Sequence, residues 1–255
     1  MPKKKSKDRS SVSSPLSIEL SWVTLRNSRE MPVTAATLSD SASSILMPSK
    51  PIACVGIDPG LSQLTMTVLP VTPKGKCDSA YVYAFKTKGE KGDDWSVRYY
   101  RIDLLCRAVD NVLSGLEDFV GRHFAAHIGV EGYAFGLRGN AVQTMAEIRQ
   151  GLLDVVMPYV QDRFFNVYVL PIPTWKSALC PGLKKVGMSQ KEAVQECIIR
   201  RWPATKEAFG KDHNKFDSFG IADVLYQAFY RPDISNPSLD RFRDREGIRR
   251  QDGQA

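Results

Sequence analysis

Short apolar runs that end at turn residues dominate the chain from residue 52 onward. The first run is apolar throughout, which is typical of a strand buried on both faces of a sheet. Proline, glycine and lysine separate it from the next two runs, so these three predict consecutive strands of an antiparallel meander. Two later runs predict a fourth and a fifth strand. The predicted strands are residues 52–57, 64–69, 80–85, 127–130 and 166–172.

Between and after these runs, apolar residues recur at helical spacing. One such stretch begins at Asp93 or Asp94, either of which is a suitable N-cap. Ser189 and Glu192 form the pattern of a capping box at the start of another helix. The predicted helices are residues 93–116, 140–159, 189–201 and 218–230, with a short one from Pro173. This order predicts an α/β fold in which helices flank a mixed five-stranded sheet.

The two ends of the chain lack these periodicities. Residues 1–50 are basic and serine-rich, and residues 231–255 are charged and interrupted by Pro232 and Pro237. We therefore expect one folded domain over residues 51–230, between two tails without a fixed fold.

The apolar runs are all shorter than the roughly 18 residues that span a bilayer, and no apolar signal segment follows the basic N-terminus. We expect a soluble, intracellular protein. The five cysteines form no CxxC pair, which is typical of buried thiols in a reducing compartment and not of a zinc site. These cysteines are Cys54, Cys77, Cys106, Cys180 and Cys197.

The formal charge of +7 is unevenly distributed. Residues 51–230 carry 21 Lys and Arg against 19 Asp and Glu, so the domain as a whole is nearly neutral. Within it, residues 163–215 hold 10 basic against 4 acidic side chains, an excess that favours contact with a polyphosphate backbone. A solvated basic face would have the same composition.

Three carboxylates are candidates for chemistry. Asp58 and Glu131 end two apolar strands, where open α/β sheets place their sites, and Asp223 lies within an apolar helix. Hard oxygen ligands without a Cys or His cluster suit Mg²⁺ or Mn²⁺, and these cations would neutralise the repulsion among the acids. A pair of such ions roughly 4 Å apart can generate an attacking hydroxide and stabilise the leaving oxygen of a phosphodiester.

Each acid also has a plain structural interpretation. Asp58 before Pro-Gly can form a turn, Glu131 can be an exposed strand-end charge, and Asp223 can lie on the surface of an amphipathic helix. Their joint placement, with the basic segment between the second and the third, favours the metal site.

Several segments resemble the motifs of the RuvC-like Holliday junction resolvases of the RNase H-like superfamily, particularly the bacteriophage-type members. Residues 56–62 (GIDPGLS) resemble the first-strand motif, residues 130–136 (VEGYAFG) the second, and residues 221–225 (IADVL) the closing helix. Residues 173–176 (PTWK) and 191–194 (KEAV) are similar to elements that line the DNA groove of that family. The resemblance covers about residues 52–230 and implies an RNase H-like fold.

The resemblance implies catalytic and metal-binding roles for Asp58, Glu131 and Asp223, with two Mg²⁺ ions and with Mn²⁺ as a substitute. The family usually places another Asp three residues before the last, where this chain has Gly220. Asp217 is the candidate fourth catalytic carboxylate. It precedes Asp223 by six residues, which turns it about 240° away on a helix, so it could instead be an N-cap.

The resemblance also implies a DNA-binding surface. Its lysines would contact phosphates, while Tyr133 and Phe135 would either stack on splayed bases or pack in the core. The candidate DNA-binding residues are Lys176, Lys184, Lys185, Lys191, Tyr133, Phe135 and Arg138.

The implied activity is Mg²⁺-dependent hydrolysis of branched DNA, above all of four-way junctions, leaving 5′-phosphate and 3′-hydroxyl ends. Cutting two symmetric strands needs two active sites, which predicts a homodimer. A flap or fork nuclease of the same fold and a non-catalytic nucleic-acid-binding relative are the alternatives. A sugar-kinase or Hsp70-like ATPase also begins with a strand, an Asp and a glycine turn, but it needs a second glycine-rich phosphate loop that this sequence lacks.

Overall fold

The computed structural model describes residues 16–25, 52–72, 74–89, 94–120, 125–132, 140–161, 165–182 and 188–248. Its strands are β1 (Leu16–Thr24), β2 (Ile52–Asp58), β3 (Gln63–Val71), β4 (Ser79–Thr87), β5 (Ala125–Glu131) and β6 (Phe165–Leu170). Its helices are α1 (Trp95–Val120), α2 (Asn140–Gln161), α3 (Ile172–Leu179), α4 (Gln190–Arg201), α5 (Thr205–Phe209), α6 (His213–Tyr230) and α7 (Pro237–Arg245).

The strands form one mixed sheet in the order β1-β4-β3-β2-β5-β6. Strands β1, β4, β3 and β2 pair antiparallel, whereas β2, β5 and β6 pair parallel. The predicted meander and crossovers are therefore confirmed, and the sheet has one strand more than the five that were expected. Because β2, β5 and β6 are parallel, their carboxyl ends meet at the same edge of the sheet.

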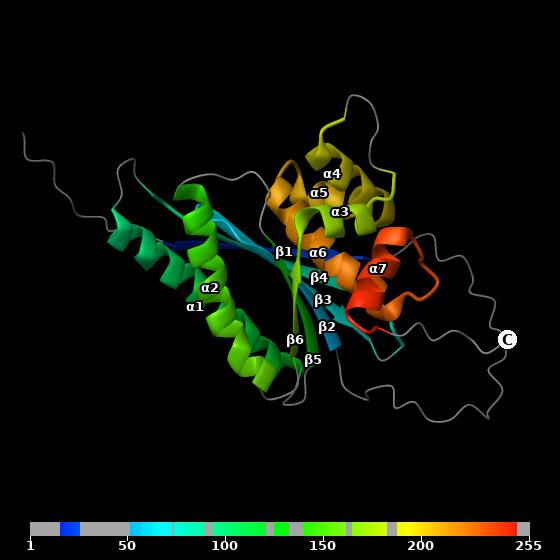
Figure 1. The fold of residues 1–255 in the computed structure, drawn as a ribbon, viewed down its shortest axis with the longest axis horizontal. Helices are drawn as coiled ribbons and strands as arrows, with labels where there is room; N and C mark the ends of the chain where they lie inside the picture. The colour runs from blue at the N-terminus through cyan, green and yellow to red at the C-terminus, as the bar shows by residue number, and fades with distance from the viewer. Residues whose placement is uncertain are drawn as a thin grey trace, which may run out of the picture.

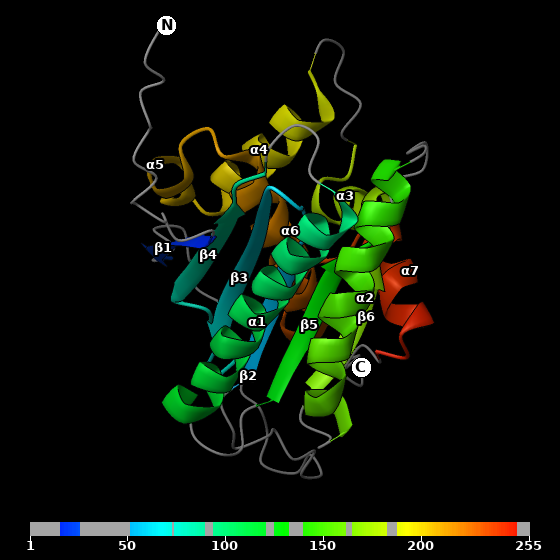
Figure 2. The same cartoon turned by 90° about the vertical axis from the view of Figure 1, so that its left-hand side faces the viewer.

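Helices cover both faces of the sheet (Figures 1 and 2). On one face, α1 and α2 pack over a core that includes Val55, Leu105 and Leu152. On the other face, α6 lies across β2, β3 and β5, with α3, α4 and α7 around it. Strand β2 contributes to both cores and is fully buried from Ala53 to Ile57, as its unbroken apolar run predicted.

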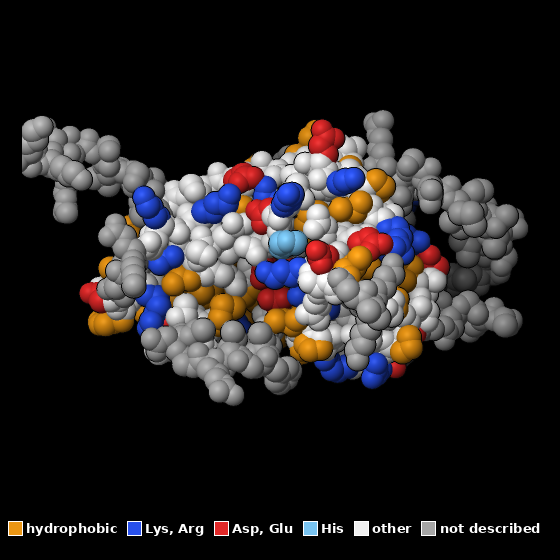
Figure 3. Space-filling model, turned by 90° about the horizontal axis from the view of Figure 1, so that it is seen from above, with side chains coloured by type: hydrophobic (Ala, Val, Ile, Leu, Met, Phe, Trp, Pro, Cys, Tyr) orange, Lys and Arg blue, Asp and Glu red, His pale blue; other side chains and the backbone are white. Residues whose placement is uncertain are grey.

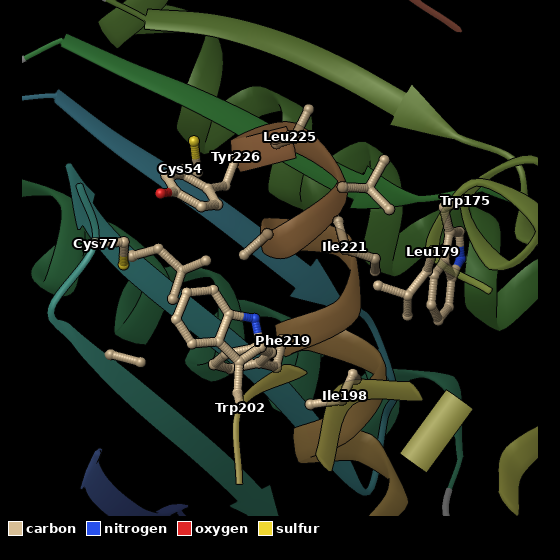
Figure 4. Close-up of a cluster of buried hydrophobic side chains, with 14 of the residues drawn as sticks. Cys54, Cys77, Trp175, Leu179, Ile198, Trp202, Phe219, Ile221, Leu225 and Tyr226 are labelled. Carbon is tan, nitrogen blue, oxygen red and sulfur yellow. The ribbon is translucent and has the colours of Figure 1, made fainter. Parts of the chain in front are cut away.

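Two glycines let α6 lie directly on the sheet. Gly56 of β2 and Gly129 of β5 are register partners. A Cβ atom at Gly56 would lie 2.1 Å from the carbonyl oxygen of Ser218, and one at Gly129 would lie 2.7 Å from a methyl carbon of Ile221. The helix therefore packs closely against the middle of the sheet, with large apolar side chains on both of its sides (Figure 4).

Strand β1 corrects the expectation that residues 1–50 have no fixed fold. Residues 16–24 pair with β4 over nine positions. Glu19 forms ion pairs with Lys86 of β4 and with the buried Lys215 of α6, and hydrogen bonds from both lysines lower the pKa of Glu19 to about 2. These partners are 67 and 196 residues away in the sequence, so the local periodicity of residues 16–24 does not predict the strand.

Helix α7 corrects the expectation of a loose tail after residue 230. The sequence pattern predicts a break at Pro237, but this residue occupies the first turn of α7, where a missing N–H costs nothing, and the side chain of Asn236 caps that turn. Leu239 and Phe242 are buried, and so is the guanidinium of Arg243. This guanidinium donates to the carbonyl oxygens of Gln227, Ala228, Arg231 and Ile234, which ties α7 to the end of α6.

The capping box at the start of α4 is present as predicted, with Ser189 and Glu192 in reciprocal hydrogen bonds. Helix α6, in contrast, begins at His213, ahead of the predicted start at Ser218. The side chain of Asp212 accepts hydrogen bonds from the backbone at Asn214 and Lys215 and thereby caps the earlier start. In the part of the chain that the structure describes, no helix has the length and apolar character needed to cross a membrane.

Candidate active site

The site lies where the parallel strands end. Asp58 is the last residue of β2, and Glu131 is the last residue of β5. Strand β6 ends at Leu170 beside them, and its carbonyl oxygen accepts a 2.7 Å hydrogen bond from the backbone N–H of Gly132. Helix α3 begins immediately afterwards, so Trp175 and Lys176 are carried to the same edge of the sheet.

Helix α6 brings a third carboxylate to this edge. Its N-terminal half is fixed to β3 by hydrogen bonds from Gln63 to Asp212, from Thr65 to the carbonyl oxygen of Asn214, and between the hydroxyls of Thr67 and Ser218. Asp217 lies between the last two of these anchors in the sequence and is buried. Asp217 is therefore held near both strand ends.

The electrostatics of the site follow from three carboxyl groups that repel one another, of which Glu131 and Asp217 are buried and Asp58 is half-buried. Burial raises the pKa of Asp58 well above its usual value, and repulsion from Glu131 and Asp217 raises it further. Burial and the charge of Asp217 likewise raise the pKa of Glu131, and burial raises the pKa of Asp217. Ionisation of all three carboxyl groups at once is therefore unfavourable without a counter-charge.

The buried ammonium of Lys176 places a positive charge beside these acids. This ammonium lies 3.9 Å from Oδ2 of Asp217 and 4.9 Å from the centre of the Trp175 ring, and the Lys176 side chain is only 8% exposed. The charge of Lys176 opposes the rise in the pKa of Asp58, Glu131 and Asp217. The predicted phosphate-binding lysine is thus a buried counter-charge of the acidic cluster.

The structure does not bring Asp223 into this cluster, which corrects the sequence-based grouping of Asp58, Glu131 and Asp223. Asp223 is fully buried on another side of α6. Its carboxylate accepts hydrogen bonds from Arg201, from the indole N–H of Trp202 at 3.2 Å, and from Gln227 at 3.0 Å. Asp223 forms an ion pair with Arg201 that joins α6 to α4, and this contact has a structural role.

The geometry of a helix explains the exchange of roles. Asp217 and Asp223 are six residues apart in α6, which separates them by about 240° around the axis and about 9 Å along it, so they cannot face the same point. The feature of the sequence that could have identified Asp217 is the position at which α6 begins. Because Asp212 is the N-cap of α6, Asp217 lies inside the helix and is not its N-cap.

The donor chemistry of the cluster fits a divalent cation. Among the described residues, no group of three or more acidic, Cys or His side chains already converges as a finished metal site. However, Asp58, Glu131 and Asp217 offer hard carboxylate oxygens, and burial together with mutual repulsion raises the pKa of Asp58 and of Glu131. A Mg²⁺ or Mn²⁺ ion would neutralise the carboxylates and relieve this repulsion.

Of the candidate DNA-binding residues, only Lys176 and Lys191 lie within the described residues. Lys191 is exposed on the first turn of α4, and its charge acts on Asp217, so it lies on the surface beside the site. Tyr133, Phe135, Arg138, Lys184 and Lys185 lie outside the described residues. On the face of the molecule seen in Figure 3, Lys and Arg side chains gather with acidic side chains among them.

No protein-family model matches the sequence, and neither does any curated protein. Its structural neighbours include RuvC bound to a Holliday junction substrate and a mitochondrial Holliday junction resolvase. Thermus thermophilus RuvC is similar with a TM-score of 0.45 and 21% identity, over 78% of this chain and 97% of that chain. The T. thermophilus RuvC complex with a Holliday junction substrate has a TM-score of 0.44 and 18% identity, over 78% of this chain and 97% of that chain. The yeast mitochondrial Holliday junction resolvase Ydc2 has a TM-score of 0.44 and 15% identity, over 77% of this chain and 83% of that chain. These likenesses concern the arrangement of strands and helices.

Proposed function

We propose that this chain is a divalent-metal-dependent endonuclease that cuts branched DNA, and four-way junctions above all. The observation that carries the proposal is the meeting of Asp58, Glu131 and Asp217 at the carboxyl end of a mixed sheet. A largely buried cluster of acids that repel one another is costly for a purely structural role. The same cluster is suited to hold Mg²⁺ or Mn²⁺.

The roles of the residues follow from their positions. Asp58, Glu131 and Asp217 would hold the cations, which would supply an activated water and stabilise charge on the leaving oxygen of a phosphodiester. Lys176 opposes the rise in the pKa of Asp58 and of Glu131 by its positive charge and so favours their ionised forms. Lys191, exposed beside the site, contacts the DNA backbone and strengthens binding without selecting a sequence.

A homodimer is part of the proposal. A four-way junction has two strands of equivalent geometry, and cutting both requires two active sites related by a two-fold axis. The chain contributes one acidic cluster, so a second copy is needed to supply the other. Sedimentation of the protein with and without junction DNA would measure this assembly.

The decisive experiment is cleavage of synthetic four-way, flap and linear duplex DNA of the same sequence, in Mg²⁺ and in Mn²⁺, by the wild type and by Asp58→Asn. We expect the wild type to cut the four-way junction fastest, and Asp58→Asn to bind the junction without cutting it. If neither metal supports cleavage of any substrate, the chain is not a nuclease. Equal rates on linear duplex would rule out the junction preference, and a faster rate on flaps would assign a flap nuclease.

A further inference from the structure

Trp175 is joined to the acidic cluster by a single hydrogen bond. The residue is fully buried, and its indole N–H donates to Oε1 of Glu131 at 3.2 Å. An indole nitrogen only donates, so it neither takes the proton of the carboxyl group nor competes with it as a metal ligand. The contact therefore fixes the orientation of the Glu131 carboxyl group through one of its two oxygens.

The position of the Trp175 ring depends on a glycine in α6. A Cβ atom at Gly220 would lie 2.9 Å from Cζ3 of Trp175 and 3.0 Å from a methyl carbon of Leu179. Any larger residue at this position would displace the ring and with it the N–H group. Gly220 is the position where the family resemblance led us to expect a further Asp, so here the space of that side chain is filled by the indole.

A second tryptophan makes the same bond on the opposite side of the helix. The indole N–H of Trp202 donates to Oδ1 of Asp223, also at 3.2 Å, and Trp202 is 5% exposed. Figure 4 shows Trp175 and Trp202 on opposite sides of α6. The chain therefore contains two buried tryptophan–carboxylate pairs, of which only one involves a carboxylate of the acidic cluster.

We propose that Trp175 is a positioning residue, whose indole N–H orients the carboxylate of Glu131 for divalent cations. This inference rests on the proposed metal-dependent function. Outer-shell hydrogen bonds to carboxylate ligands orient them, and their loss typically costs about 10- to 100-fold in metal affinity or activity. Packing of the ring alone would contribute to stability and would leave the metal affinity unchanged.

The test compares Trp175→Phe with Trp202→Phe, because both changes keep an aromatic ring and remove one indole N–H from a buried carboxylate. Binding of Mn²⁺ to the DNA-free protein is measured by electron paramagnetic resonance, together with the thermal midpoint and the Mg²⁺ concentration for half-maximal cleavage. We expect Trp175→Phe to weaken Mn²⁺ binding about 10-fold or more and to raise the Mg²⁺ requirement. Trp202→Phe should lower the thermal midpoint and leave Mn²⁺ binding as in the wild type.

Equal weakening by both variants, or normal Mn²⁺ binding by a folded Trp175→Phe protein, would overturn the proposal. A measurement on the unmodified protein covers the case in which Trp175→Phe does not fold. In a Mg²⁺ titration followed by NMR, the indole N–H resonance of Trp175 should shift while that of Trp202 stays in place, and an unmoved Trp175 resonance at saturating Mg²⁺ overturns the inference. A wild type that binds no Mn²⁺ contradicts the proposed function itself.

Discussion

Gly56 of β2 and Ser218 of α6 are in backbone contact, so close that a Cβ atom at Gly56 would lie 2.1 Å from the carbonyl oxygen of Ser218. Asp58 follows Gly56 by two residues and Asp217 directly precedes Ser218. The contact therefore sets how far apart the two carboxylates lie. A glycine that carries no chemistry of its own determines whether the acidic cluster assembles.

Gly56→Ala is expected to destabilise the protein by about 3 kcal/mol or more, because overpacking against a backbone carbonyl leaves no side chain free to yield. Urea unfolding measures the change. The matched control is Gly115→Ala in α1, where a Cβ would meet nothing within 4 Å, and alanine there should stabilise by about 0.5–1 kcal/mol. Similar stability of the two variants would mean that α6 does not lie directly on β2.

Asp217→Asn and Asp223→Asn should have opposite effects. Asp217→Asn should reduce cleavage at least about 100-fold with little loss of stability, because it removes a repelling charge from the cluster. Asp223→Asn should destabilise by about 3 kcal/mol, since it leaves Arg201 without its buried partner, while the folded fraction still cuts. Cleavage rates per folded molecule, with circular dichroism to count that fraction, distinguish the two. Loss of cutting in a stable Asp223→Asn protein would restore Asp223 to the active site.

The stability of the metal-free protein should fall as the pH rises. Burial and mutual repulsion raise the folded-state pKa of Asp58, Glu131 and Asp217. A group with a raised folded pKa contributes stability below its unfolded pKa, and this contribution is lost as the pH passes through the folded value. Thermal midpoints in EDTA should therefore decline above about pH 4, and Asp58→Asn should flatten the decline.

Added Mg²⁺ should reverse that decline, and more so at higher pH, because carboxylates must lose their protons before they bind a cation. The difference between thermal midpoints with Mg²⁺ and with EDTA, taken across the pH range, measures the effect. A Mg²⁺ effect that does not depend on pH would indicate binding elsewhere on the protein.

Glu19 should give the opposite pH dependence at the other end of the sheet. Hydrogen bonds from Lys215 and Lys86 lower its pKa from 4.5 to about 2. A lowered folded pKa contributes stability above the unfolded value, so the docking of β1 should weaken as the pH falls from about 4.5 to about 2. Glu19→Gln should expose the β1 amides to hydrogen exchange at neutral pH while the amides of β5 stay protected. Unchanged protection of β1 would show that the backbone pairing with β4 suffices.

Substitutions of Lys176 and of Lys191 should differ in their effect on the salt dependence of DNA binding. Lys191→Gln removes an exposed phosphate contact and should reduce the slope of log affinity against log salt by about 1. Lys176→Met removes a buried charge beside Asp217, so it should lower the cleavage rate and leave that slope nearly unchanged. Fluorescence anisotropy of labelled junction DNA in Ca²⁺ measures the slope, and an equal change in both variants would place Lys176 in the DNA contact.

Local patterns determined most of the secondary structure and two of the three acids. The apolar run of β2 and the strand that ends at Glu131 are buried as predicted, because a strand carries its burial pattern in its own residues. The capping box of α4 could also be predicted from the sequence, since it is an interaction between residues three positions apart.

Partners that are distant in the sequence decided the rest. Strand β1 depends on Lys86 and Lys215, and α7 depends on carbonyl groups of Gln227 and Arg231. Contacts between distant residues also determine which of Asp217 and Asp223 belongs to the acidic cluster. Both are acids in one buried helix, and only the rotation of α6, set by the glycine contact at Gly56 and the polar anchors on β3, turns Asp217 toward Asp58 and Asp223 toward Arg201.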